Sequence, residues 1–142
     1  QPLTAVNFDY ATDFAEGYAK VGKQGKYGYI DKNFQLVIPY QFEQSNNFVN
    51  GFAWFQDKGK FGVIDTEGKV LIPAMYDDSF FFVEGLAKVK KDGKFGFIDT
   101  RNQVVIPIQF DNAQDFNHGK AYVELNNQTY LVDKLGHHEP VK

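Results

Sequence analysis

The stretch Gly-Lys-Phe-Gly-Phe-Ile-Asp at residues 93–99 decides the fold, because versions of it recur at a fixed interval along the chain. It appears as Gly-Lys-Tyr-Gly-Tyr-Ile-Asp at residues 25–31 and as Gly-Lys-Phe-Gly-Val-Ile-Asp at residues 59–65. A fourth copy keeps only its Val-Asp end. The recurring pairs, each 34 residues from the next, are Ile30-Asp31, Ile64-Asp65, Ile98-Asp99 and Val132-Asp133.

Other positions recur with the same spacing and without gaps. They comprise a proline (Pro39, Pro73, Pro107), two aromatic positions (Phe8, Phe42, Tyr76, Phe110 and Phe14, Phe48, Phe82, Phe116), and a glycine followed two residues later by alanine (Gly17, Gly51, Gly85, Gly119). Periodicity at this many positions indicates a repeat architecture. We therefore expect one domain over residues 1–142, with four repeats at about residues 6–39, 40–73, 74–107 and 108–141.

Each repeat has the sequence pattern of short strands. In the third repeat, residues 85–89 alternate small or apolar residues with variable ones, as in a half-buried strand. A hairpin turn follows at residues 91–93, where Gly93 can adopt a positive φ. Residues 103–106 form the next apolar run, and we expect Pro107 to stop it because proline cannot donate to a sheet. The segment 109–117 is less regular and could hold a short helical turn or an irregular crossover.

The pattern predicts about three strands per repeat and twelve in total. Each recurring aspartate opens a second turn, where its side chain can accept main-chain N–H groups. Gly68, Asn102 and Gly136 suit the left-handed position of that turn. Phe34 occupies this position in the first repeat, so we expect the neighbouring Asn33 to take the role instead.

The recurring motif resembles that of the WG repeat family, and the similarity extends from about Phe8 to the end of the chain. The tryptophan that names the family is Tyr27, Phe61 and Phe95 here, and the fourth copy has neither this aromatic residue nor the glycine after it. That copy resembles a terminal cap. The resemblance implies an interaction module without known chemistry, often found in bacterial envelope or exported proteins.

The fold class expected from these observations is all-β: a tandem array of four 34-residue β-meander repeats. We favour an open, curved, solenoid-like array, with a ring-closed, propeller-like array as the alternative. The sequence begins with Gln1 rather than Met, which is typical of a mature chain after removal of a signal peptide or of a chosen fragment boundary. We expect an extracytoplasmic location, in the periplasm or at the cell surface.

Composition excludes several classes of function. The chain of 142 residues has a net charge of -3, so it lacks the basic footprint of a nucleic-acid-binding protein. It has no cysteine, which excludes disulfides, thiolate metal sites and a cysteine nucleophile. No apolar run reaches the roughly 18 residues of a membrane helix.

We expect no enzymatic activity, no cofactor and no metal. The repeated aspartates could line a shared channel, but their place at turns indicates a structural role. No calcium-loop run of alternating acidic residues is present. His137-His138-Glu139 could ligate a metal, yet adjacent residues of a strand point to opposite faces. The sequence also lacks a nucleophile elbow, a phosphate loop and a zinc-protease motif.

The positions where the repeats differ are the candidate binding residues. Phe80 and Phe81 stand where the other repeats have polar residues, so they are either an exposed partner site or a filling between repeats. Trp54 and Tyr122 stand where the other two repeats have Lys20 and Lys88. Because alanine and valine should face inward on this strand, Trp54 and Tyr122 should face solvent, or else cover part of an adjacent repeat.

Two functions follow from these residues. The first is a scaffold for protein–protein interaction, a subunit of a bacterial surface or envelope assembly, with a partner surface of Phe80, Phe81, Trp54 and Tyr122. The alternative is a carbohydrate-binding module in which Trp54 and Tyr122 stack on sugar rings. In neither case do we expect a nucleic-acid partner or a membrane span.

Overall fold

A computed structural model describes residues 8–141 of the chain, and Gln1 lies outside this range. Within these residues all regular structure is β-strand, arranged in four antiparallel sheets of four strands each. One sheet corresponds to each repeat, so the prediction of an all-β array of four repeats is confirmed. The expected count of twelve strands is wrong, because residues 8–141 contain sixteen: each repeat places one short strand before its three-stranded meander.

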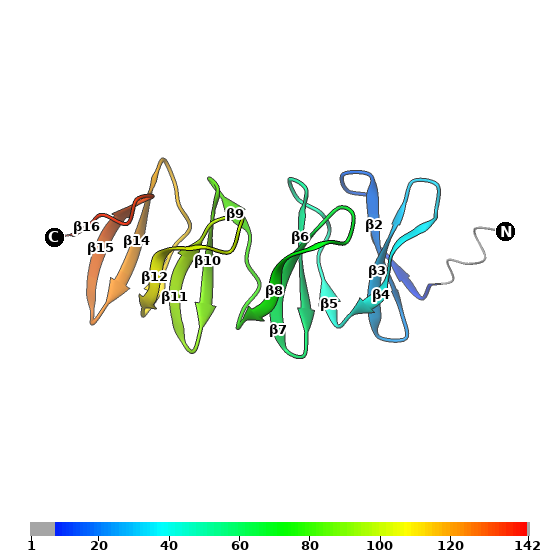
Figure 1. Ribbon diagram of the computed structural model, residues 1–142, viewed down its shortest axis with the longest axis horizontal. Coiled ribbons are helices and arrows are strands. Elements are labelled where there is room, and N and C mark those ends of the chain that lie inside the picture. The colour runs from blue at the N-terminus through cyan, green and yellow to red at the C-terminus, as the bar shows by residue number, and fades with distance from the viewer. Residues whose placement is uncertain (1–7, 142) are drawn as a thin grey trace. The chain divides into compact units, whose positions relative to one another are not determined.

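The chain divides into two compact units, Gln1–Ala74 and Met75–Lys142. The first two sheets are neighbours in sequence (Figure 1). Sheet one contains β1 (Tyr10–Ala11), β2 (Tyr18–Lys23), β3 (Lys26–Asp31) and β4 (Leu36–Phe42). Sheet two contains β5 (Gln44–Ser45), β6 (Phe52–Asp57), β7 (Lys60–Asp65) and β8 (Val70–Tyr76).

The other two sheets follow the same order of strands. Sheet three contains β9 (Phe82–Val83), β10 (Leu86–Lys91), β11 (Lys94–Ile98) and β12 (Val104–Phe110). Sheet four contains β13 (Asn112–Ala113), β14 (Lys120–Leu125), β15 (Gln128–Asp133) and β16 (His138–Pro140). The single-domain extent and the choice between an open and a ring-closed array remain predictions.

The hairpin predicted around Gly93 is present. Lys91 pairs with Lys94, which leaves a loop of two residues, and both of these have positive φ: 55° at Asp92 and 82° at Gly93. This is the geometry that matches the twist of the flanking strands. The segment 109–117, for which a helical turn was an option, instead ends β12 and holds β13.

The expectation that Pro107 stops the third strand is wrong, because β12 runs through it to Phe110. The pairing between β11 and β12 shifts at this point: Phe97 pairs with Ile106, whereas Phe95 pairs with Phe110. The extra residues of β12 form a bulge, and a bulge is where a strand tolerates a residue without an N–H group. The first repeat has the same shift between β3 and β4.

The glycine after the recurring aromatic residue is required by this bulge. A Cβ atom at Gly28 would lie 2.4 Å from the main-chain oxygen of Ile38 and 2.8 Å from the carbonyl carbon of Pro39, so no side chain fits. Gly62 of the second repeat makes the same close approach, 2.3 Å from the main-chain oxygen of Ile72. The fourth repeat has Tyr130 at this position. There, Tyr130, Leu131 and Val132 pair with consecutive residues of β16 without any shift. The loss of the glycine and the loss of the bulge therefore occur together.

The core consists mainly of recurring residues, as the alternating pattern predicted. Three sets of recurring positions are almost inaccessible to solvent. These are the alanine after the recurring glycine, the isoleucine or valine before the recurring aspartate, and the isoleucine of the third strand. They are Ala19, Ala53, Ala87 and Ala121; Ile30, Ile64, Ile98 and Val132; and Ile38, Ile72 and Ile106. Because they lie on the same strands in each repeat, the repeat period specifies the buried face.

The expectation that Asn33 takes the left-handed position in the first repeat is wrong, because Phe34 itself has φ of 60°. In the second repeat this position is Gly68, and a Cβ atom there would lie 3.1 Å from Ile38 of the first repeat. Phe34 meets no preceding repeat within the described residues. Its ring packs edge-on against Phe14 instead, with 6.0 Å between ring centres.

Within each unit, one repeat covers the next through aromatic contacts. Tyr29 of the first repeat packs on Phe48 of the second, with ring centres 4.8 Å apart. Phe97 of the third repeat packs on Phe116 of the fourth at 4.9 Å. Tyr29 and Phe97 are fully buried, so one face of each odd-numbered sheet receives the following repeat.

Candidate functional site

The four recurring aspartates hold turns, as predicted. In the third repeat, Oδ1 of Asp99 accepts hydrogen bonds from the main-chain N–H groups of Arg101 and Gln103, both at 2.9 Å. The other three aspartates make the same pair of bonds at 2.9–3.0 Å. The carboxylates are therefore engaged with the backbone and are dispersed, one in each repeat.

The histidines at the C-terminal end do not converge. Nδ1 of His137 lies 3.1 Å from Oδ2 of Asp133, whereas the ring of His138 packs edge-on against Tyr130. Residues 8–141 contain no group of three or more histidine, aspartate or glutamate side chains placed to hold a metal ion.

Lys20 has the repeat position at which Trp54 and Tyr122 were expected to face solvent, yet Lys20 does not. Its side chain is buried beside Tyr27 and Tyr10, with Nζ 4.8 Å from the centre of the Tyr27 ring. Nζ donates a hydrogen bond of 2.8 Å to the main-chain oxygen of Ser45 in the next repeat. Burial lowers the pKa of Lys20 below its ordinary value of 10.5. Lys20 therefore joins the first two repeats.

The third repeat uses the same device. Nζ of Lys88 donates to the main-chain oxygen of Ala113 in the fourth repeat at 3.2 Å. A glutamate adds a second link in both units. Glu16 accepts hydrogen bonds from the N–H groups of Asn50 and Gly51, and Glu84 accepts from those of His118 at 2.7 Å and Gly119 at 2.8 Å.

These two positions alternate along the chain. The odd repeats carry the lysine and the glutamate, and the even repeats carry an aromatic residue and a different polar residue: Trp54 with Asn50, and Tyr122 with His118. The odd repeats thus bind their neighbours with residues that the even repeats lack. Trp54 and Tyr122 occupy the position at which the odd repeats have the lysine that bonds to the following repeat.

Of the two options for Phe80, the exposed partner site is wrong, since only 4% of its surface is accessible. Its ring packs edge-on against Tyr76 at 5.4 Å and against Phe82 at 6.3 Å. In the third repeat the short first strand begins only at Phe82, later than in the other repeats. The loop before it turns Phe80 into the core, and Phe80 leaves the candidate partner surface.

Phe81 is exposed, as predicted, with 51% of its surface accessible. It lies between the buried Phe80 and the partly buried Phe82, in a loop whose other exposed residues, Asp78 and Ser79, are polar. The anchored neighbours hold this loop to the sheet, so the Phe81 ring is presented from a fixed base.

Trp54 is only partly exposed. Its ring packs edge-on against Phe61 with 5.4 Å between centres, and its main-chain N–H donates to Oδ1 of Asn46 at 2.9 Å. Phe61 belongs to the same repeat as Trp54, so this contact packs Trp54 within its own repeat and does not show the stated alternative, in which Trp54 covers an adjacent repeat.

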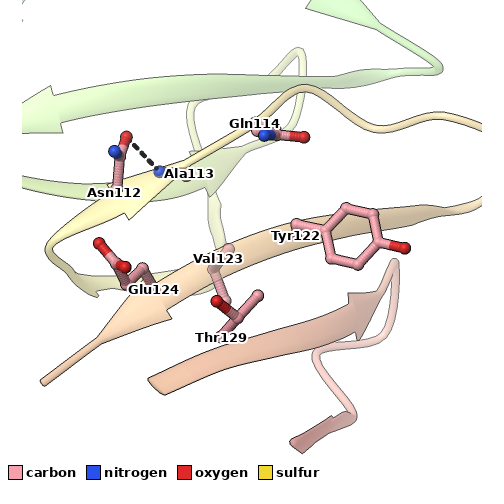
Figure 2. Close-up of a pocket in the computed structure, with 7 residues that line it drawn as sticks. All are labelled: Asn112, Ala113, Gln114, Tyr122, Val123, Glu124 and Thr129. Atoms are coloured by element: carbon pink, nitrogen blue, oxygen red, sulfur yellow. Dashed lines mark hydrogen bonds between the residues drawn. The ribbon is translucent and has the colours of Figure 1, made fainter. Parts of the chain in front are cut away.

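Tyr122 is exposed, as predicted, with 48% of its surface accessible. It borders an open groove of about 170 Å³ on sheet four, which Asn112, Gln114, Glu124 and Thr129 also line (Figure 2). Glu124 pairs with Thr129 and with Asn112 across the sheet. Directly paired residues point to the same face, so these polar groups and Tyr122 share one surface.

The structure therefore does not gather the four predicted residues into one site. Phe80 is core, Trp54 is largely packed, and Phe81 is not among the residues that line the groove beside Tyr122. The sequence-based reasoning missed Thr129, Glu124 and Gln114. The sequence feature that could have indicated this groove is Thr129, which stands where the other repeats have a large aromatic residue.

No helix that is long and apolar enough to cross a membrane is found within residues 8–141. The sequence has no significant match among curated proteins.

Two solved structures share the fold at low sequence identity. One is Hsv2 of Kluyveromyces lactis, with a TM-score of 0.53 and 10% identity over 89% of this chain and 46% of that one. The other is PorZ of Porphyromonas gingivalis, described as an essential bacterial surface component of the type-IX secretion system, with a TM-score of 0.51 and 9% identity over 95% of this chain and 22% of that one. The chain thus spans about half of Hsv2 and about a fifth of PorZ.

The family described as "WG containing repeat" matches four consecutive segments, residues 3–27, 27–61, 61–95 and 95–128. Each match after the first begins at the recurring aromatic position, Tyr27, Phe61 or Phe95. On this evidence, the chain belongs to the WG containing repeat family.

Proposed function

We propose that this chain is a non-catalytic scaffold that binds another protein, with Phe81 at the centre of the contact. The observation that carries the proposal is the separation between recurring and non-recurring residues. Recurring apolar residues form the core, whereas Phe81 is half exposed and replaces Asp13, Asn47 and Asp115 of the other repeats. An exposed aromatic ring on a rigid base is a common centre of protein contacts.

The engagement of the aspartates supports the non-catalytic part of the proposal. Each carboxylate already accepts two main-chain hydrogen bonds and caps a turn. General acid–base catalysis needs a carboxylate within reach of a bound substrate and with a tuned pKa. Residues fully used in turns serve the frame instead.

The proposal includes a place at the bacterial cell surface or envelope. The motivation is the WG family resemblance together with a fold shared with a bacterial surface component, PorZ. Cell fractionation and protease treatment of intact cells test this part. Protection of the chain from added protease in cells with a permeabilised outer layer would contradict it.

The protein-binding part is tested with two matched variants. Phe81→Ser removes the non-recurring ring, and Val104→Ser removes an equally exposed apolar residue, 53% accessible, at a position that recurs as Leu36 and Val70. The immobilised wild-type chain is incubated with an extract of its native source, and bound proteins are identified by mass spectrometry.

Recovery of a specific partner should fall at least about tenfold with Phe81→Ser and stay unchanged with Val104→Ser. Both variants should melt at the wild-type temperature, since surface changes of this kind are nearly neutral. Full recovery of the partner by the Phe81→Ser variant would refute the assignment.

A further inference from the structure

The outer face of sheet four carries a groove that exists because one side chain is small. In the first three repeats this space holds the ring of Tyr27, Phe61 or Phe95. Lys20 lies over the first ring, Trp54 packs on the second and Lys88 lies over the third. In the fourth repeat Thr129 replaces the ring, and the open volume of about 170 Å³ beside Tyr122 results.

We propose that this groove binds the pyranose ring of a neutral polysaccharide, with Tyr122 as the stacking platform. The proposal is independent of Phe81 and goes beyond the protein-binding function, because it uses a different surface. Tyr122 offers the platform directly: its side chain is about half exposed, and it lines the groove together with Gln114 and Thr129 (Figure 2).

The polar groups around Tyr122 suit sugar hydroxyls. Asn112 and Gln114 contribute amides, Glu124 a carboxylate and Thr129 a hydroxyl, all on the rim or floor of the groove. Amides and hydroxyls both donate and accept hydrogen bonds, and a carboxylate accepts them. A pyranose combines an apolar face of C–H groups with a rim of hydroxyls. One aromatic face surrounded by such groups is complementary to it.

The size and continuity of the surface favour a chain rather than a single sugar. The groove is smaller than the 300–1,000 Å³ typical of pockets for drug-sized ligands, so it holds about one ring. A second depression of about 330 Å³ shares Tyr122 and Gln114 with it and extends towards His118 and Lys120. Tyr122 therefore stands between two adjoining subsites on one face.

The charge of the groove favours a neutral ligand. Glu124 lines the groove beside Thr129, where no lysine or arginine does, whereas Asp115 and Lys120 both line the second subsite. A uronic acid or sulfated sugar placed in that groove would face Glu124 without a compensating cation, which is unfavourable.

The fourth repeat also lacks the residues with which odd repeats hold a following repeat. Tyr122 stands in place of Lys88, and His118 stands in place of Glu84. Leu131 is the counterpart of Phe97, which lies under the fourth repeat and is fully buried, yet Leu131 remains partly exposed. This face is thus built differently from a stacking face, and its polar lining fits a hydrated ligand.

Affinity electrophoresis tests the proposal. The whole chain is run in native gels that contain a β-1,3-glucan, a β-1,4-glucan, an α-1,4-glucan or a galactomannan, with polygalacturonate as the anionic probe. We expect retardation by at least one neutral polymer. Tyr122→Ala should weaken it about tenfold, whereas Tyr122→Trp should preserve it because the platform remains.

The decisive variant is Thr129→Phe, which gives the fourth repeat the residue that the second and third repeats already have. It should fill the groove and abolish retardation while the melting temperature stays the same or rises. Phe81→Ser is the matched control, because its surface is separate, and it should bind the polymer as the wild type does.

Three results would overturn the assignment: no retardation by any neutral polymer, retardation by polygalacturonate alone, or unchanged retardation in both Tyr122→Ala and Thr129→Phe. If the Phe81→Ser variant also loses binding, together with the groove variants, the polymer does not bind specifically in this groove and the assignment is wrong. If the Thr129→Phe variant does not fold, the comparison between Tyr122→Ala and Tyr122→Trp decides. The two variants are then compared at equal stability.

Discussion

Nζ of Lys20 and the main-chain oxygen of Ser45 are joined by a hydrogen bond of 2.8 Å that links one repeat to the next. Lys88 makes the corresponding bond to Ala113 two repeats later, at 3.2 Å. The second and fourth repeats have Trp54 and Tyr122 at this position. The structural period within each compact unit is therefore a pair of repeats, of which the first binds the second through its own side chains.

Replacing Lys20 by methionine should destabilise the chain by about 1.5 kcal/mol, because a hydrogen bond from a charged donor to a buried carbonyl is lost while the apolar stem is kept. Lys88→Met should cost less, since Lys88 is more exposed and its bond is longer. Urea unfolding of both variants measures the difference. Equal stability of Lys20→Met and wild type would mean that burying the ammonium costs as much as its bond returns.

The bulge at the third strand gives a second prediction. Gly62→Ala should cost about 3 kcal/mol or more, because its Cβ would overlap the main-chain oxygen of Ile72 and backbone cannot move aside easily. Gly59→Ala is the control: nothing lies within 4 Å of its Cβ, and only its φ of 81° is unfavourable. That variant should lose about 1 kcal/mol. Comparable urea midpoints for the two alanine variants would contradict the close approach.

Most of the frame could be predicted from the sequence, because it depends on residues that repeat. The spacing of Ile98-Asp99 and its counterparts identified the repeats, the turns and the buried alanine positions. The prediction failed where the outcome depends on a facing strand or on a neighbouring repeat. Nothing local to Pro107 announces a bulge, which arises from the facing Gly96, and nothing local to Lys20 announces the carbonyl of Ser45 that makes its burial acceptable.

The candidate sites were predictable to a lesser degree. Position in the repeat identified Phe81 and Tyr122 as candidates for exposure, but it left Phe80 open between an exposed partner site and a filling between repeats. The sequence shows that the repeats alternate in pairs, because the odd repeats have Lys20 and Lys88 where the even repeats have Trp54 and Tyr122. The meaning of this alternation depended on contacts across repeats, which no single-repeat pattern contains.

The role of the aspartates can be tested with a conservative pair of variants. Asp99→Asn keeps an oxygen that accepts from Arg101 and Gln103, so we expect a loss of stability below about 1 kcal/mol. Asp99→Ala removes the acceptor and should cost about 2 kcal/mol for two main-chain N–H groups. Thermal unfolding of the two variants provides the measurement. Equal destabilisation would show that the charge, rather than the turn, is what matters at this position.

Acid should weaken the second unit through Glu84. Hydrogen bonds from the N–H of Gly119, then from that of His118 and from Lys134, lower the pKa of Glu84 below 4.5. A lowered folded-state pKa gives stability that is present above pH 4.5 and is lost as the pH falls through the folded value. Glu84→Gln should therefore melt below the wild type at pH 7, and the difference should shrink towards pH 3.

The control for this acid titration is Glu139→Gln, which changes an exposed glutamate of β16 in the same unit. A Glu84→Gln difference that stays constant from pH 7 to pH 3 would show that the glutamine keeps the same bonds and that ionisation contributes nothing.

Alkali should act through Tyr29, at the contact between the first two repeats. Burial raises the pKa of its hydroxyl from 10.0 to about 12, and the hydroxyl donates a hydrogen bond to the main-chain oxygen of Asn46. A raised folded-state pKa gives stability that is intact below pH 10, where the unfolded chain also keeps the proton. That stability is lost as the pH rises from 10 to 12, because only the unfolded chain ionises freely.

The loss attributable to this one group is about 2–3 kcal/mol across that interval. Urea unfolding at pH 8, 10 and 12 should show a steeper decline in the wild type than in Tyr29→Phe, which has no hydroxyl to ionise. Tyr122→Phe is the control, because it makes the same substitution at an exposed tyrosine. Parallel decline of the wild type and Tyr29→Phe would mean that water reaches this ring and that the contact between the two repeats opens before the chain unfolds.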